Sequence, residues 1–155
     1  MGAALGFSGG NGLNLMAESP LRVLALVTDA FGGYGGIAQY NRDFLSALAQ
    51  CEGVGEVIVL PRAGASSPDT MPCGVRQLRA LKGRLAYSFA ALERARAHRP
   101  IDVVFCGHLF MVPLAAVTAK LLNARLWVQV HGVEAWQDLS GLHRRWSNGR
   151  WWSPQ

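Results

Sequence analysis

The chain has 155 residues, half of them apolar and 16% charged, a composition that predicts one globular domain and excludes a wholly disordered chain. Its net charge of +5 suits contact with anions, whether phosphates, nucleic acid or an acidic membrane surface, without choosing among them. The three cysteines are far apart and form no C-x-x-C pair, which argues against a metal or redox site and predicts reduced thiols in the cytoplasm. We expect no signal peptide and no membrane-spanning helix.

The first predicted elements surround a cluster of glycines. Residues 1–20 are rich in Gly, Asn and Ser without periodicity, which predicts a disordered N-terminal extension. RVLALVT (22–28) is a continuous apolar run, typical of a parallel strand buried on both faces. Helical spacing of apolar residues predicts a helix over about 36–50. The glycines between the two elements are Gly32, Gly33, Gly35 and Gly36; the apolar stripe of the helix is Ile37, Tyr40, Phe44, Leu45 and Leu48.

The rest of the chain continues to alternate between strand and helix patterns. Strands are predicted at 56–61, 75–78, 101–106 and 124–131, and helices at 83–98 and 109–122. In the helix at 83–98, Leu85, Phe89 and Leu92 are expected to face the core.

This alternation predicts an α/β fold, a Rossmann-like, doubly wound parallel sheet with helices on both faces. Right-handed crossovers favour the strand order 3-2-1-4-5. Ligands of such sheets bind beyond the carboxyl ends of the strands. Three segments are expected to meet there: the glycine loop, Gly107-His108 and His131-Gly132.

A dinucleotide site is one interpretation of the glycines, since Gly33, Gly35 and Ala38 satisfy G-x-G-x-x-G/A after a strand. The spacing argues against it, because residues 29–32 separate the strand from the motif and Arg62 stands where a ribose-binding carboxylate is needed. An arginine would suit a 2′-phosphate, so an NAD(P)-binding domain remains an alternative. A P-loop is excluded, because no Gly-Lys-Ser/Thr follows the glycines.

Three blocks of sequence point to one family. GGYGGIAQYNRDFLSALA (32–49), GHLFMVPLAAVTAKLL (107–122) and VQVHGVEAW (128–136) together resemble the N-terminal, acceptor-side domain of family 4 glycosyltransferases, which are retaining GT-B enzymes. The resemblance implies that residues 21–140 form one Rossmann-like half of a GT-B fold. It also implies a nucleotide-sugar donor held by a C-terminal domain, a sugar or lipid-linked acceptor, and no other cofactor or metal.

The resemblance also implies roles for individual residues. Gly35 and Gly36 would approach the donor pyrophosphate, which agrees with exposed amides at a helix N-terminus. His131 matches the histidine of the family's HG motif and would be the catalytic-site residue beside the reacting sugar. Four further residues are assigned to the acceptor or the cleft: Gly33, His108, Gly132 and Glu134. For His108 a turn residue, and for Glu134 a helix cap, remain equal alternatives.

A basic cluster, Arg76, Arg79, Lys82 and Arg84, lies around the third strand and the start of the second long helix. A solvated face is the simpler interpretation; peripheral contact with the inner face of a membrane is the other. Binding of nucleic acid is not expected.

The C-terminal part departs from the family pattern. The E-x7-E stretch with which the family binds the donor nucleotide is not found after these blocks. We therefore expect a truncated domain that is inactive alone. Residues 141–155 are irregular, and a shifted reading frame near Ser147 would restore a family-like helix, which suggests an out-of-frame tail. A stand-alone binding module and one subunit of a two-chain transferase remain alternatives.

Overall fold

The computed structural model describes residues 19–63 and 71–131. The predicted elements are present, with bounds that differ by a few residues. In chain order they are β1 (Leu21–Val27), α1 (Gly36–Ala49), β2 (Val54–Pro61), β3 (Val75–Gln77), α2 (Arg84–Ala97), β4 (Val103–Cys106), the 3-10 helix η1 (Leu109–Met111), α3 (Val112–Leu122) and β5 (Arg125–Val128). The predictions for the C-terminal tail, and for all but the last two residues of the N-terminal extension, lie outside the described residues.

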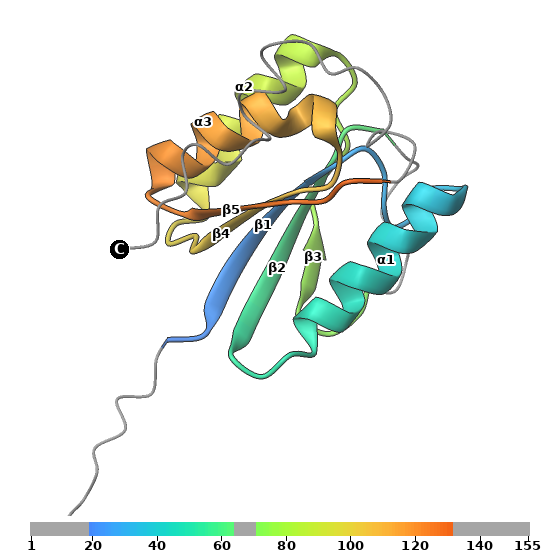
Figure 1. Ribbon diagram of the computed structural model, residues 1–155, viewed down its shortest axis with the longest axis vertical. Helices are drawn as coiled ribbons and strands as arrows, with labels where there is room; N and C mark the ends of the chain where they lie inside the picture. Colours follow the sequence, from blue (N-terminus) through green and yellow to red (C-terminus); the bar gives the residue numbers. More distant parts are fainter. Residues whose placement is uncertain (1–18, 64–70, 132–155) are drawn as a thin grey trace, which may run out of the picture.

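The sheet confirms the predicted topology. Its five strands are parallel and follow the order β3-β2-β1-β4-β5. Helix α1 covers one face, and α2 and α3 cover the other (Figure 1). The chain therefore has a Rossmann-like α/β fold, with the switch in strand order between β1 and β4.

The core is divided by the sheet into two parts, because successive residues of a strand point to opposite faces. Val23, Ala25 and Val27 of β1 belong to the cluster that includes Leu45 of α1. Leu24 and Leu26 belong to the cluster that includes residues of α2 and α3. This two-sided burial explains why β1 is a continuous apolar run rather than an alternating one.

The prediction for α2 was wrong about which face is buried. Leu85 and Phe89 are 77% and 73% exposed instead of facing the core, and Leu92 is only half-buried. The buried face of α2 consists of Tyr87 and three alanines, Ala90, Ala91 and Ala95. These residues also recur at helical spacing, so either face satisfied the pattern. The three alanines are small and let the helix lie close to its neighbours.

The stripe predicted for α1 is correct only in its C-terminal half. Leu45 is fully buried, whereas Ile37 is 40% and Tyr40 is 51% exposed. Instead, Ala38 and Asn41 are buried from the N-terminal half of α1. The start of α1 lies at the carboxyl-end edge of the sheet, where less of the sheet is available to cover its side chains (Figure 1). No helix within the described residues is long and apolar enough to cross a lipid bilayer.

Candidate functional site

The first half of the loop between β1 and α1 is fixed by side chains from two elements. Arg42 of α1 donates hydrogen bonds to the carbonyl oxygens of Ala30 (3.0 Å) and Gly33 (2.7 Å). Gln77 of β3 donates to the carbonyl oxygen of Phe31 at 2.8 Å and accepts from its amide at 3.1 Å. These bonds satisfy backbone groups that the turn leaves without strand or helix partners.

Asp29 completes this arrangement from inside the loop. Its carboxylate accepts from the amide of Ala30 at 2.8 Å, and its carbonyl oxygen accepts from the buried Asn41 side chain at 2.7 Å. A Cβ at Gly33 would overlap the Asp29 carboxylate. Close packing thus accounts for Gly33 without a ligand, and its assignment to the cleft stays a prediction.

Gly35 and Gly36 differ from Gly33, because nothing lies within 4 Å of the Cβ that either would carry. Gly35 has a φ of 94° and precedes α1 without a side chain that caps the helix. No acidic residue occupies the first turn either. The first amides of α1 are therefore accessible, with the positive end of the helix dipole behind them, which suits a phosphate.

The same geometry opposes a dinucleotide site. Residues 28–35 separate β1 from α1, whereas the dinucleotide fingerprint needs a tight turn directly after the strand. The Asp29 carboxylate lies against Gly33, so negative charge already occupies the first part of the motif. A pyrophosphate placed there would face like charge.

The two predicted histidines lie near each other at the carboxyl ends of β4 and β5. The centroids of the His108 and His131 rings are 6.1 Å apart. His131 is half-buried, and its Nε2 lies 3.2 Å from the carbonyl oxygen of Gly107 and 3.1 Å from the side-chain nitrogen of Gln129. In one tautomer Nε2–H donates to Gly107; in the other Nε2 accepts from Gln129. Either contact orients the ring.

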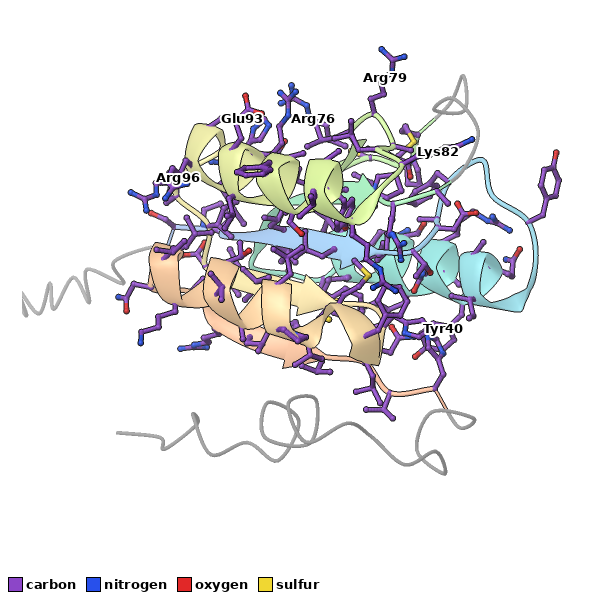
Figure 2. The ribbon with its side chains drawn as sticks, turned by 90° about the horizontal axis from the view of Figure 1, so that it is seen from above. Tyr40, Arg76, Arg79, Lys82, Glu93 and Arg96 are labelled. Atoms are coloured by element: carbon purple, nitrogen blue, oxygen red, sulfur yellow. The ribbon has the colours of Figure 1, made fainter. Side chains whose placement is uncertain are left out.

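Tyr40 joins this pair, although its spacing predicted a core residue. Its ring meets the His131 ring edge to face, with centroids 5.9 Å apart. Figure 2 shows Tyr40 extending from α1 toward the segment that follows β5. Tyr40, His108 and His131, which are far apart in the sequence, thus lie together at one edge of the sheet.

Phe110 and Arg62 extend the row of side chains on the other side of His108. The Phe110 ring lies 4.3 Å from the His108 ring, and the Arg62 guanidinium carbon lies 5.2 Å from the centroid of Phe110. The sequence offered a partial signal for this contact, since Arg62 directly follows one predicted strand and Phe110 lies in the turn and first helical residues after another. Contact across β1 between them was not predictable from spacing.

Two predicted residues, Gly132 and Glu134, lie outside the described residues. Within the described ranges, no group of three or more His, Cys, Asp or Glu side chains could hold a metal ion.

A cavity of about 770 Å³ lies at the opposite, amino-end edge of the sheet. Its lining includes Arg99, Lys120 and Arg125. Arg99 donates to the carbonyl oxygen of Leu121 at 2.8 Å, near the C-terminus of α3, where the helix dipole favours cations. The C-terminus of α3 thus accounts for Arg99 and Lys120, whereas Arg125 is the first residue of β5. Ligands of this fold bind at the carboxyl-end edge instead.

A family model for a glycosyl transferase 4-like domain matches residues 35–154, which is more than half of the chain. The matched range begins at Gly35 and includes His108, His131, Gly132 and Glu134. No curated protein matches the sequence.

Proposed function

Since the chain belongs to the glycosyl transferase 4-like family, we propose that it forms the acceptor-side domain of an enzyme that transfers a sugar from a nucleotide-sugar donor. The observation that carries the proposal is the meeting of His108 and His131 at the edge where the glycine loop also ends. That edge is where ligands of doubly wound sheets bind. A sugar or lipid-linked acceptor would occupy it.

His131 is the residue proposed to act on the substrate. Its half-buried ring is held by Tyr40 and, depending on the tautomer, by the carbonyl oxygen of Gly107 or the side chain of Gln129, so the ring is oriented before any ligand arrives. An oriented imidazole can donate to or accept from sugar hydroxyls without further ordering. His108, Gly132 and Glu134 would line the acceptor side of the same site.

Gly35 and Gly36 are proposed to approach the donor pyrophosphate. The open space around both residues and the uncapped start of α1 support this role. A donor phosphate held there would interact with main-chain amides and with the helix dipole.

The donor itself would be bound by a second domain, either on the same polypeptide or on a partner chain. Within the described residues the histidines and the glycine loop lie on one edge of the sheet that no other described element covers. Catalysis requires preorganised groups on the other side of the substrate as well, which a second domain would supply. We therefore propose that residues 1–155 alone do not transfer sugar. A binding module that uses this edge without chemistry is the alternative.

The proposal includes a cytoplasmic location and peripheral contact with an anionic membrane surface. Leu85 and Phe89 lie one turn apart on α2 and are highly exposed, while Arg79, Lys82 and Arg84 are exposed nearby. Figure 2 shows Arg76, Arg79 and Lys82 extending on the α2 side of the molecule. Apolar side chains beside cations suit the interface of an anionic bilayer.

The first prediction concerns turnover. The purified 155-residue chain, mixed with UDP-, GDP- and ADP-sugars and with sugar or lipid-phosphate acceptors, should release no nucleoside diphosphate above background. The measurement is a coupled assay together with mass spectrometry of the acceptor. Sugar transfer by the chain itself, with contaminating enzyme excluded, would contradict the need for a second domain.

The DNA downstream of the coding sequence separates the remaining alternatives. A donor domain with E-x7-E in a shifted frame supports an interrupted single-chain enzyme, and a neighbouring gene for that domain supports a two-chain enzyme. If neither is present, the binding module is favoured. Where a donor domain is found, in a shifted frame or in a neighbouring gene, its co-expression with the chain should restore sugar transfer.

A further inference from the structure

We propose that Arg62 and Phe110 form a subsite for an anionic group attached to a ring, such as the phosphate of a sugar phosphate. The inference rests on the proposed function, because it places a charged part of the ligand at the same edge of the sheet. It adds a cationic side chain to an edge at which the glycine loop offers only main-chain amides.

Arg62 is held at the switch in strand order. It directly follows β2, and its amide donates to the carbonyl oxygen of Val27, the last residue of β1, at 3.0 Å. Its guanidinium lies over Phe110, which follows β4. The cation thus reaches across the end of β1 to Phe110, which in turn contacts His108.

The hydrogen bonding of Arg62 separates it from comparable arginines. Three described arginines are half-buried: Arg22, Arg42 and Arg62. Arg22 donates to Glu56 and to the carbonyl oxygen of His98, and Arg42 donates to the carbonyl oxygens of Ala30 and Gly33. Among the described residues, the guanidinium of Arg62 has neither an acceptor nor a carboxylate partner; the two ion pairs there both use Glu56.

No group in the described part of the chain neutralises Arg62. The buried Tyr87 lies close enough to feel its charge, but burial raises the pKa of this phenol far above its ordinary value. The Tyr87 hydroxyl instead donates to the carbonyl oxygen of Leu60 at 2.8 Å and remains neutral. The contact with Phe110 offsets only part of the lost hydration of the guanidinium. A phosphate or carboxylate that accepts two hydrogen bonds from the guanidinium would supply the missing partner.

Phe110 indicates which kind of group would carry the anion. It is 42% exposed, and one neighbour of its ring is His108. The exposed part can pack against the apolar face of a sugar or the face of a nucleobase. The charged group comes either from the donor, as a nucleotide phosphate, or from an acidic acceptor.

The test uses NMR titration of the isotope-labelled 155-residue chain with glucose 1-phosphate, glucose, inorganic phosphate and UDP. Glucose 1-phosphate should shift the amide signals of Gly107 and His108 in a saturable manner, whereas glucose should not. Arg62→Gln should weaken this binding at least about tenfold, the effect of losing a charge-assisted hydrogen bond. Arg62→Lys should recover part of it, since the charge stays and the planar fork is lost.

Arg96→Gln is the matched control, because Arg96 is exposed in the last turn of α2. Phe110→Leu should weaken glucose 1-phosphate but not inorganic phosphate. Competition by UDP assigns the subsite to the donor phosphate; binding of glucose 1-phosphate alongside UDP assigns it to an acidic acceptor. Equal binding by the Arg62→Gln and Arg96→Gln chains, or no saturable shift with any phosphate probe, would overturn the subsite. Because these readouts do not require turnover, their failure is distinguishable from failure of the proposed transferase activity.

Discussion

At the scale of single residues, the glycines of one loop have different reasons to be glycine. Gly33 is buried against the Asp29 carboxylate, whereas Gly35 and Gly36 have open space around them. Only Gly35 of these three has a φ in the left-handed region that favours glycine. The motif therefore combines a packing requirement at Gly33, a backbone requirement at Gly35 and open space at Gly36.

The second prediction compares Gly33→Ala with Gly36→Ala. The new methyl group at position 33 would displace the Asp29 side chain and break its hydrogen bond to Ala30, so unfolding should become easier by about 1 kcal/mol. Gly36→Ala should change the free energy of unfolding by no more than about 0.5–1 kcal/mol, in the stabilising direction. Urea denaturation followed by circular dichroism measures both values. Equal destabilisation by the two variants would remove the distinction.

At the scale of elements, α2 shows that helical periodicity alone does not identify the buried face. Its alanine face and its Leu85–Phe89 face both recur at helical spacing, and the structure buries the alanines. The buried face combines the Tyr87 ring, which donates to the carbonyl oxygen of Leu60, with alanines that let α2 lie close to α3. Leu85 and Phe89 are left exposed, and they are the residues of the proposed membrane contact.

The third prediction tests both faces of α2. Leu85→Ser combined with Phe89→Ser should leave the free energy of unfolding within about 0.5 kcal/mol of its original value, because both side chains are exposed. Ala91→Leu should cost about 1–3 kcal/mol, since Ala91 is fully buried. In sedimentation with vesicles of phosphatidylglycerol and phosphatidylcholine, the double variant should bind less than the original chain. Unchanged binding would exclude this face as the membrane contact.

At the scale of the whole molecule, the site depends on the sheet bringing distant segments to one edge. Tyr40, Gly107 and His131 come from α1, the end of β4 and the segment after β5, and their contacts hold the imidazole. None of these contacts is part of the two core clusters. Their loss should therefore affect the reaction more than the fold.

The fourth prediction applies to the chain assembled with its donor domain. His131→Ala should lower sugar transfer by about 100-fold or more, a size typical of a positioned catalytic group, with a small change in melting temperature. Ile58→Val serves as the control: Ile58 is fully buried in β2, so it should lose about 0.5–1.5 kcal/mol of stability without loss of transfer per folded molecule. If His131→Ala lowers stability and activity to the same extent, His131 is a structural residue.

The sequence by itself determined the strands, their parallel order and the edge at which Gly35, His108 and His131 gather. Continuous apolar runs are characteristic of strands buried on both faces, and the carboxyl ends of parallel strands share one edge. The three blocks of sequence also identified the family, which the match over residues 35–154 confirms.

Only the tertiary structure decided which face of α2 is buried, that Tyr40 meets His131, and that Arg62 lies over Phe110 without an acceptor among the described residues. Each depends on the rotation of a helix or the direction of a side chain relative to a segment far away in the sequence. Local periodicity does not contain that information, because it is set by the space that the neighbouring elements leave.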